Sequence, residues 1–116
     1  MGTFILLTDT ENKVIDIELD GTFSEDDGIR SIQAYQQTIN PINPLEYELK
    51  IDCIKLNVTA PDVVPVLESC FVMFKTDGFI KVTLLLANNP ILKMQLARLG
   101  RKAGLENLEI ITTVQV

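Results

Sequence analysis

The stretch from residue 82 to residue 111 constrains the fold more than any other part of the chain. It begins with Val82–Leu86, a short and almost entirely apolar run, which predicts a strand that is covered on both faces of a sheet. Leucines then recur at helical spacing over 92–99, which predicts an amphipathic helix. The segment 108–112 is extended again, so the whole stretch predicts a β-α-β unit.

Both ends of this helix carry capping residues. Asn88 and Asn89 have side chains that can accept a hydrogen bond from the first helical turn. Pro90 suits the first helical position, where its missing N–H would have no partner. Gly104 favours the left-handed conformation that ends many helices. The helix is therefore predicted to begin at Pro90 and to end just before Gly104.

The rest of the chain continues the alternation of strands and helices. Strands are predicted at 3–8, 14–19 and 47–56, and helices are predicted from a Ser24 cap to the stop at Pro41 and over 63–74. The order is β-β-α-β-α-β-α-β. We therefore expect one α/β domain, residues 1–116, with a single mixed, largely parallel sheet, an N-terminal hairpin and three helices.

Side-chain spacing also predicts which faces of the first two helices are buried. On the first helix the predicted inward residues are Ile29, Ile32, Tyr35 and Ile39. On the second helix the predicted core residues are Val66, Leu67, Cys70 and Phe74. The two cysteines, Cys53 and Cys70, have apolar neighbours and are expected to be buried free thiols.

Composition limits the classes of function. The net charge is −6, and residues 1–52 carry eleven acidic against three basic side chains. Phosphate binding needs clustered positive charge, so nucleic acid is not expected as a partner. No apolar run approaches the roughly 20 residues that cross a bilayer. The N-terminus shows no secretory signal, so a cytoplasmic location is expected.

A basic cluster on the third predicted helix has two interpretations. Its members are Lys93, Arg98, Arg101 and Lys102. They can form a solvated helix face with cations near the negative end of the helix dipole. Alternatively, they can form a docking surface for an acidic partner or an anionic membrane. The sequence leaves both interpretations open.

The residues that enzymes most often use are missing. The chain has no histidine, and it contains neither of the common glycine-rich phosphate loops. The acidic pairs Asp26-Asp27 and Asp16 with Glu18 lie at a helix start and on one face of a strand. Helix capping and solvation are the favoured roles for both pairs. We therefore expect no catalytic residue, no metal site, no cofactor and no enzyme.

The chain resembles a known family over about Thr3 to Thr112. The residues that carry the resemblance are Ile51-Asp52 at a strand end, the Asp77-Gly78 break and the sequence Asn89-Pro90…Gly104-Leu105…Ile110. Together with the order of elements, they look like a STAS domain, the fold of bacterial anti-sigma-factor antagonists and of sulfate-transporter tails. The resemblance implies that the domain works by binding another protein.

The family's sharpest motif is an Asp-Ser-Ser-Gly-like turn whose serine a partner kinase phosphorylates. Counting ten residues forward from Asp52, or sixteen back from Gly78, leads to Asp62 at the phosphorylated position. Around it, Ala60 replaces the usual aspartate, Pro61 the first serine and Val63 the glycine. This departure argues against switching by serine phosphorylation. Thr59 is the nearest upstream hydroxyl and could be modified in place of the lost serine.

Asp62 has two compatible interpretations. It can cap the second helix, in which case Pro65 would be the third helical residue. It can also place a fixed negative charge where the phosphate would lie. A carboxylate carries one charge and two acceptor oxygens, whereas a phosphate brings about −1.5 to −2 and three. Asp62 would therefore mimic the phosphorylated state only in part.

The resemblance leads to one main functional expectation and one alternative. The main expectation is a non-enzymatic regulatory or scaffolding module that binds an anti-sigma-factor-like or kinase-like protein. The predicted partner-binding residues are Thr59, Ala60, Pro61, Asp62, Val63 and Val64. The alternative is an accessory subunit of a membrane transport or lipid-handling system, which would touch the membrane only peripherally. A homodimer is compatible with either expectation.

Overall fold

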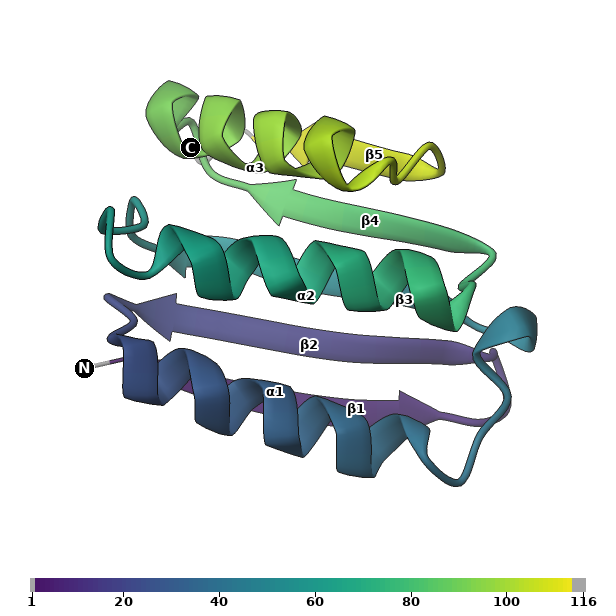
Figure 1. The fold of residues 1–116 in the computed structure, drawn as a ribbon. Helices are drawn as coiled ribbons and strands as arrows, with labels where there is room; N and C mark the ends of the chain where they lie inside the picture. Colours follow the sequence, from purple (N-terminus) through teal and green to yellow (C-terminus); the bar gives the residue numbers. More distant parts are fainter. Residues whose placement is uncertain (1, 114–116) are drawn as a thin grey trace.

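A mixed sheet of five strands supports three helices (Figure 1). The computed structural model describes residues 2–113. Helices and strands follow the predicted order, with one short 3-10 helix, η1, added before β3. Their bounds are β1 Thr3–Asp9, β2 Val14–Gly21, α1 Glu25–Ile39, η1 Pro44–Glu46, β3 Glu48–Leu56, α2 Val64–Asp77, β4 Lys81–Leu86, α3 Pro90–Ala103 and β5 Leu108–Thr112.

The order of the strands explains where the helices lie. β1 and β2 form an antiparallel hairpin, whereas β2, β3, β4 and β5 are parallel, each paired with the next along the chain. Every crossover therefore steps in the same direction across the sheet. Because such crossovers are right-handed, all three helices lie on one face, as Figure 1 shows. No helix or strand among residues 2–113 covers the other face, which we call the open face.

The open face corrects the prediction that the strand at Val82–Leu86 is covered on both faces. Val82, Leu84 and Leu86 are buried, whereas the side chains between them are partly exposed. An apolar run is typical of a parallel strand between two layers of helices. Here the uniform direction of the crossovers puts every helix on the same side, so one face of β4 has no layer to pack against.

α1 begins with a capping box. Ser24 Oγ accepts a hydrogen bond from the Asp27 N–H (3.1 Å), and Asp27 Oδ2 accepts one from the Ser24 N–H (3.0 Å). The carboxylate also accepts hydrogen bonds from the Gly2 N–H (3.1 Å) and from Arg30 (2.5 Å). These contacts, above all those from the backbone of Ser24 and Gly2, lower the pKa of Asp27 from 3.8 to about 2. The predicted capping role of Asp27 is confirmed.

The inward face of α1 differs from the prediction at one residue, because Ile29 is 44% exposed. The helix approaches α2 through Gly28, where an added Cβ would lie 2.8 Å from Val66 Cγ1. It also meets α2 through Tyr35, whose hydroxyl donates a hydrogen bond to Asp77 (2.5 Å). These contacts set the rotation of the helix, and the residue after Gly28 is turned about 100° away from them. The other three predicted residues are buried or partly buried.

The core lies between the helices and the sheet. Phe71 of α2 is 1% exposed and packs edge-to-face against Phe74, with ring centroids 5.8 Å apart. Of the four core residues predicted on α2 only Phe74 is fully buried, because the helix turns Phe71 toward the sheet. The largest fully buried side chains are Phe71, Ile15, Leu49, Leu84, Leu86, Leu92, Leu96 and Val82.

α3 has the predicted bounds, Pro90–Ala103, and both predicted end signals are confirmed. Asn89 Oδ1 accepts a hydrogen bond from the Leu92 N–H (3.1 Å), so Asn89 is the cap and Asn88 is not. Pro90 takes the first helical position. Gly104 has a φ of 75°, the left-handed conformation expected at a helix end. These local signals explain why the helix could be delimited from the sequence.

Both cysteines are free thiols. Cys53 is buried on β3, and Cys70 is partly buried on α2. Among the described residues, no helix has the length and apolar character that a membrane crossing requires. The molecule as a whole consists of one layer of helices packed on one sheet (Figure 1).

Candidate partner-binding site

The predicted site lies in the loop that joins β3 to α2, at the edge where the parallel strands end (Figure 1). Where the loop begins, the Asn57 N–H donates a hydrogen bond to Gly21 O (3.0 Å). Asn57 Nδ2 donates a second one to Thr22 Oγ1 (2.7 Å). Gly21 is the last residue of β2, so these hydrogen bonds attach the loop to the neighbouring strand and to the segment that leads into α1.

Gln95, on α3, holds the middle of the loop. Its Oε1 accepts a hydrogen bond from the Thr59 N–H, and its Nε2 donates one to Thr59 O, both at 2.9 Å. A side-chain amide has both a donor and an acceptor, so one glutamine satisfies both backbone groups of Thr59. Sequence reasoning missed Gln95, because 36 residues separate the two partners and no local pattern marks the contact.

α2 starts without a side-chain cap, which corrects the prediction that Asp62 caps it. The N-cap residue is Val63, and Pro65 is the second helical residue instead of the third. Ala60 O accepts hydrogen bonds from the N–H groups of Val63 (2.9 Å) and Val64 (3.2 Å), and Val63 O accepts the next two. Since Pro65 has no N–H, backbone carbonyls satisfy every donor at the helix start, and no side-chain cap is needed.

The carboxylate of Asp62 is consequently left for solvent or for a partner. Its side chain is exposed, and it takes part in no hydrogen bond or ion pair within residues 2–113. Pro61, next to it, is exposed as well. A negative charge is favoured near a helix start by the helix dipole. The result is one fixed charge on a loop that is attached at Asn57 and Thr59.

The six residues predicted to contact a partner differ in accessibility. Pro61 and Asp62 are exposed, Thr59, Ala60 and Val64 are partly buried, and Val63 is only 4% exposed. Val63 therefore belongs to the interior of this structure, and its assignment as a partner-contacting residue stays a prediction. Phosphorylation of Thr59 stays a prediction, and a kinase would have to reach a partly buried side chain.

Apolar side chains adjoin the exposed tip of the loop. Val58 precedes Thr59 and is 40% exposed. Ile91 and Met94, in the first turns of α3, are 63% and 65% exposed. The pairing of Gln95 with Thr59 places these turns beside the loop. Sequence reasoning passed over Ile91 and Met94, although both are apolar residues outside the buried leucine stripe of the helix, and that was the signal available.

The basic cluster on α3 is exposed, as predicted. Lys93, Arg98, Arg101 and Lys102 all lie on the outer side of the helix. One of them, Lys102, pairs with Glu68 of α2 at 3.3 Å, across an exposed surface. An exposed pair of this kind contributes little to stability. The cluster is therefore available for binding, and the solvated-face interpretation fits it equally well.

Burial keeps the two thiols and the Tyr35 hydroxyl in their neutral forms near pH 7. Burial raises the pKa of the Cys53 thiol to about 12 and that of the Cys70 thiol to about 11, so both are neutral near pH 7. Burial and the hydrogen bond to Asp77 also raise the pKa of Tyr35 far above its ordinary value. Within residues 2–113, no three acidic or cysteine side chains come close enough together to hold a metal ion.

A scan against models of known protein families and a search of curated proteins found no match to this chain. The function therefore has to be inferred from the residues of the site. They present one carboxylate and the exposed Val58 on a loop held by hydrogen bonds from two neighbouring segments, with Ile91 and Met94 of α3 beside it. Such a surface is suited to contact another macromolecule, because apolar contact area and a charged group are the usual parts of an interface.

Proposed function

We propose that this chain is a STAS-like domain that works by binding another protein and has no catalytic activity of its own. The observation that carries the proposal is Asp62. Its carboxylate is exposed and without a partner among residues 2–113, on a loop attached at Asn57 and Thr59. The mixed sheet with an opening hairpin and three helices is compatible with that fold.

The proposed interface is centred on Pro61 and Asp62 and is extended by Val58, Ile91 and Met94. The apolar side chains supply contact area that a partner can remove from water. A lysine or arginine of the partner would face the carboxylate of Asp62. Because the loop is already held in place, binding would cost little conformational entropy there.

The charge on Asp62 is permanent, in contrast to that of a phosphorylated serine. By the resemblance, the partner would be related to anti-sigma factors or to the kinases that act on their antagonists. A carboxylate provides about half of the charge of a phosphate and two acceptor oxygens instead of three. We therefore propose a regulatory or scaffolding module with a fixed binding state, which serine phosphorylation does not switch.

The test is quantitative capture of partners from the native host with the wild type, Asp62→Ser and Glu106→Ser, read by mass spectrometry. Glu106→Ser is the matched control, because it removes one exposed carboxylate from a loop at the opposite edge of the molecule. We expect one partner to fall at least tenfold with Asp62→Ser alone. If that partner is a kinase, it should phosphorylate the new serine in the purified variant.

Equal capture by all three proteins would refute the proposed interface. Misfolding would not explain a loss, because Asp62 makes no cap and its replacement should change the free energy of unfolding by about 0.5 kcal/mol or less. Urea unfolding of the purified Asp62→Ser protein checks that point. A partner that is lost from a fully stable variant can then be attributed to the missing carboxylate.

A second candidate function is that of an accessory subunit at an anionic membrane or transporter surface. The observation in its favour is the outer stripe of α3, where Ile91, Met94, Arg98 and Arg101 follow each other at helical spacing and are all exposed. Flotation with anionic and neutral vesicles tests it. Binding to anionic vesicles that is abolished by Arg98→Glu with Arg101→Glu would favour it, and the absence of any binding would remove the membrane version.

A further inference from the structure

α1 and α2 run side by side and contact each other at two places. Near their starts, the backbone of Gly28 approaches Val66 so closely that an added Cβ would lie 2.8 Å from Val66 Cγ1. Near their ends, the Tyr35 ring packs edge-on against Phe74, with centroids 5.3 Å apart. The Tyr35 hydroxyl also donates a hydrogen bond to Asp77 at 2.5 Å. These two contacts set the separation of the helices.

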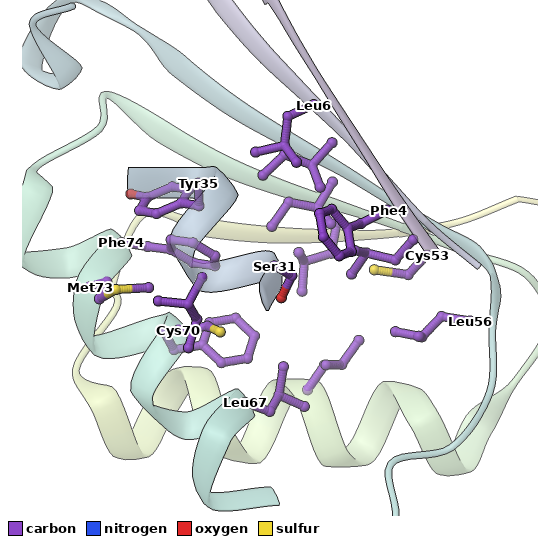
Figure 2. Close-up of a pocket in the computed structure, with 17 residues that line it drawn as sticks. Phe4, Leu6, Ser31, Tyr35, Cys53, Leu56, Leu67, Cys70, Met73 and Phe74 are labelled. Atoms are coloured by element: carbon purple, nitrogen blue, oxygen red, sulfur yellow. The ribbon is translucent and has the colours of Figure 1, made fainter. Parts of the chain in front are cut away.

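Between the two contacts, both helices carry small side chains. Ser31 lies about one turn from Gly28 and from Tyr35, and Cys70 has the corresponding place on α2. Figure 2 shows both side chains facing the same space. Both side chains line a hollow between the helices and the sheet. We call this region, Ser31 and Cys70 with the space beneath them, the seam.

A cavity of about 70 Å³ lies beneath the seam, between the two helices and the sheet (Figure 2). Phe4 and Leu6 of β1 and Cys53 of β3 are among the residues on its sheet side. A second hollow, also of about 70 Å³, lies next to it and reaches Asn57 and Thr59 of the loop. The residues that line both hollows are Leu19, Ser31, Leu56, Leu67 and Cys70.

The walls of both hollows are almost wholly apolar, and the few polar groups are already satisfied. Ser31 Oγ donates a hydrogen bond to Gly28 O (2.7 Å), and the Tyr35 hydroxyl donates to Asp77. The thiol of Cys53 is buried and that of Cys70 is partly buried, and both are neutral near pH 7. No buried side-chain nitrogen or oxygen of the described residues lacks a hydrogen-bond partner. Water would gain few hydrogen bonds in such a space, whereas an apolar group would be removed from water there.

We propose that the seam is a binding site for an uncharged hydrocarbon group of about six carbon atoms. Each hollow has a volume of about 70 Å³, and because they share five lining residues, a ligand that spans both would have space of the same order as a Leu/Ile/Phe-lined cavity of about 150 Å³ that accepts benzene. The second hollow ends at the polar loop residues Asn57 and Thr59, where a polar end of the ligand can reach water. Two sources fit this chemistry, a free small molecule and the end of an acyl chain. The inference does not depend on the proposed protein partner.

The test uses the full chain with labelled isoleucine and leucine methyl groups, observed by NMR during titration with hexan-1-ol. We expect saturable shifts at Leu19, Leu56 and Leu67, which line the hollows. Leu45 and Ile80 are the internal control, because they are exposed, line neither hollow and report non-specific association. A second titration with dodecanoate distinguishes the sources: competition with hexan-1-ol indicates an acyl chain, and its absence a free small molecule.

Ser31→Leu and Cys70→Leu are the decisive variants, because each places a larger apolar side chain in the seam. The matched control is Ser69→Leu, which adds the same side chain at an exposed position one residue away. We expect the dissociation constant of hexan-1-ol to rise at least tenfold in either seam variant and to stay unchanged in the control. Thermal unfolding should show that a seam variant is at least as stable as the wild type.

Two results would overturn the inference. One is the absence of saturable shifts at the lining methyl groups, or shifts of equal size at Leu45 and Ile80. The other is unchanged binding of hexan-1-ol by a folded seam variant. If neither seam variant folds, the wild-type shift map decides alone, because it compares methyl groups that line the hollows with exposed methyl groups that do not, within one protein. Loss of the protein partner described above would leave these measurements unaffected, so the two ideas can fail separately.

Discussion

The two faces of the sheet are built from alternate residues of the same strands, yet they differ in composition. On the face that the helices cover, Ile15, Leu49 and Leu84 are exposed by 1% or less. On the open face, Asp16 of β2 lies opposite Lys50 of β3, and both side chains are exposed. A clean alternation of apolar and charged residues is typical of a sheet that has water on one side.

The outer parts of the open face are less polar than its middle. Ile5 and Leu7 of β1 are 55% and 64% exposed, and together with Leu85 of β4 they border a hollow of about 220 Å³ over the charged middle. Parallel strands usually have both faces covered, so an open face made of them is unusual. The face without a layer of helices is therefore indicated by the charged residues at alternate positions of β2 and β3, such as Asp16 and Lys50, and not by the parallel pairing of the strands.

The largest expected effect separates neighbouring residues of β4. Leu84→Ala should cost about 2–5 kcal/mol of unfolding free energy, because it opens a cavity in the core. Leu85→Ala should cost about 1 kcal/mol or less, since its side chain lies partly exposed on the open face. Urea unfolding of both variants at one protein concentration measures the difference.

Equal costs for the two leucines would break the comparison, because the open face would then be covered in solution. Unfolding at several protein concentrations would identify the cover. If the midpoint rises with concentration, a second copy of the chain covers the open face, as the expected compatibility with a homodimer allows. If the midpoint is constant and the costs differ as expected, the open face is in contact with water.

A medium effect is expected where α1 is attached to the covered face. Ser24→Ala should cost about 1 kcal/mol, because it removes a helix cap. Asp27→Asn should change the pH dependence. Since the folded pKa of Asp27, about 2, lies below its ordinary value of 3.8, the carboxylate stabilises the fold above pH about 4, and this stabilisation is lost as the pH falls toward 2.

Urea unfolding between pH 7 and pH 2 measures this acid limb. We expect a shallower limb for Asp27→Asn than for the wild type, because the variant lacks the carboxylate whose folded pKa is lowered. Some slope should remain, because hydrogen bonds from Asn12 also lower the pKa of Asp9. Parallel limbs for the wild type and Asp27→Asn would show that the capping box does not hold in solution.

The predictions that succeeded from the sequence rest on local signals, whereas most of those that failed depend on contacts between distant parts of the chain. Asn89, Pro90 and Gly104 act within one or two turns, so they delimit α3 correctly. Coverage of a strand depends on the order of all five strands, which no short pattern contains. Ile29 was misplaced because contacts with another helix set the rotation of α1. Local spacing cannot show such contacts.

At the candidate site, one local prediction also failed. The position of Asp62 on an exposed loop before α2 could be predicted from turn and helix signals. Its role as a cap could not, because the carbonyl of Ala60 satisfies the helix start instead. Gln95 holds Thr59 across 36 residues of sequence, and Val63 is buried by the packing of α2. Both facts depend on which elements become neighbours.

The smallest expected effect concerns the ion pair between Lys81 of β4 and Glu109 of β5. Their side chains meet on the open face, where each is more than 40% exposed. The contact raises the pKa of Lys81, so any stabilisation is present at neutral pH and lost only as the pH rises beyond the ordinary lysine range. Water and salt screen an exposed pair, and holding two flexible side chains together costs entropy.

A double-mutant cycle with Lys81→Ala and Glu109→Ala should therefore show no coupling beyond experimental error at 0.15 M salt. A clear coupling energy that persists in 1 M salt would mean that the pair is shielded from water. Both side chains lie on the open face, so this cycle reports on the environment of that face and leaves the core unchanged. Absence of coupling here, beside a large cost at Leu84, is the sharpest form of the difference between the two faces.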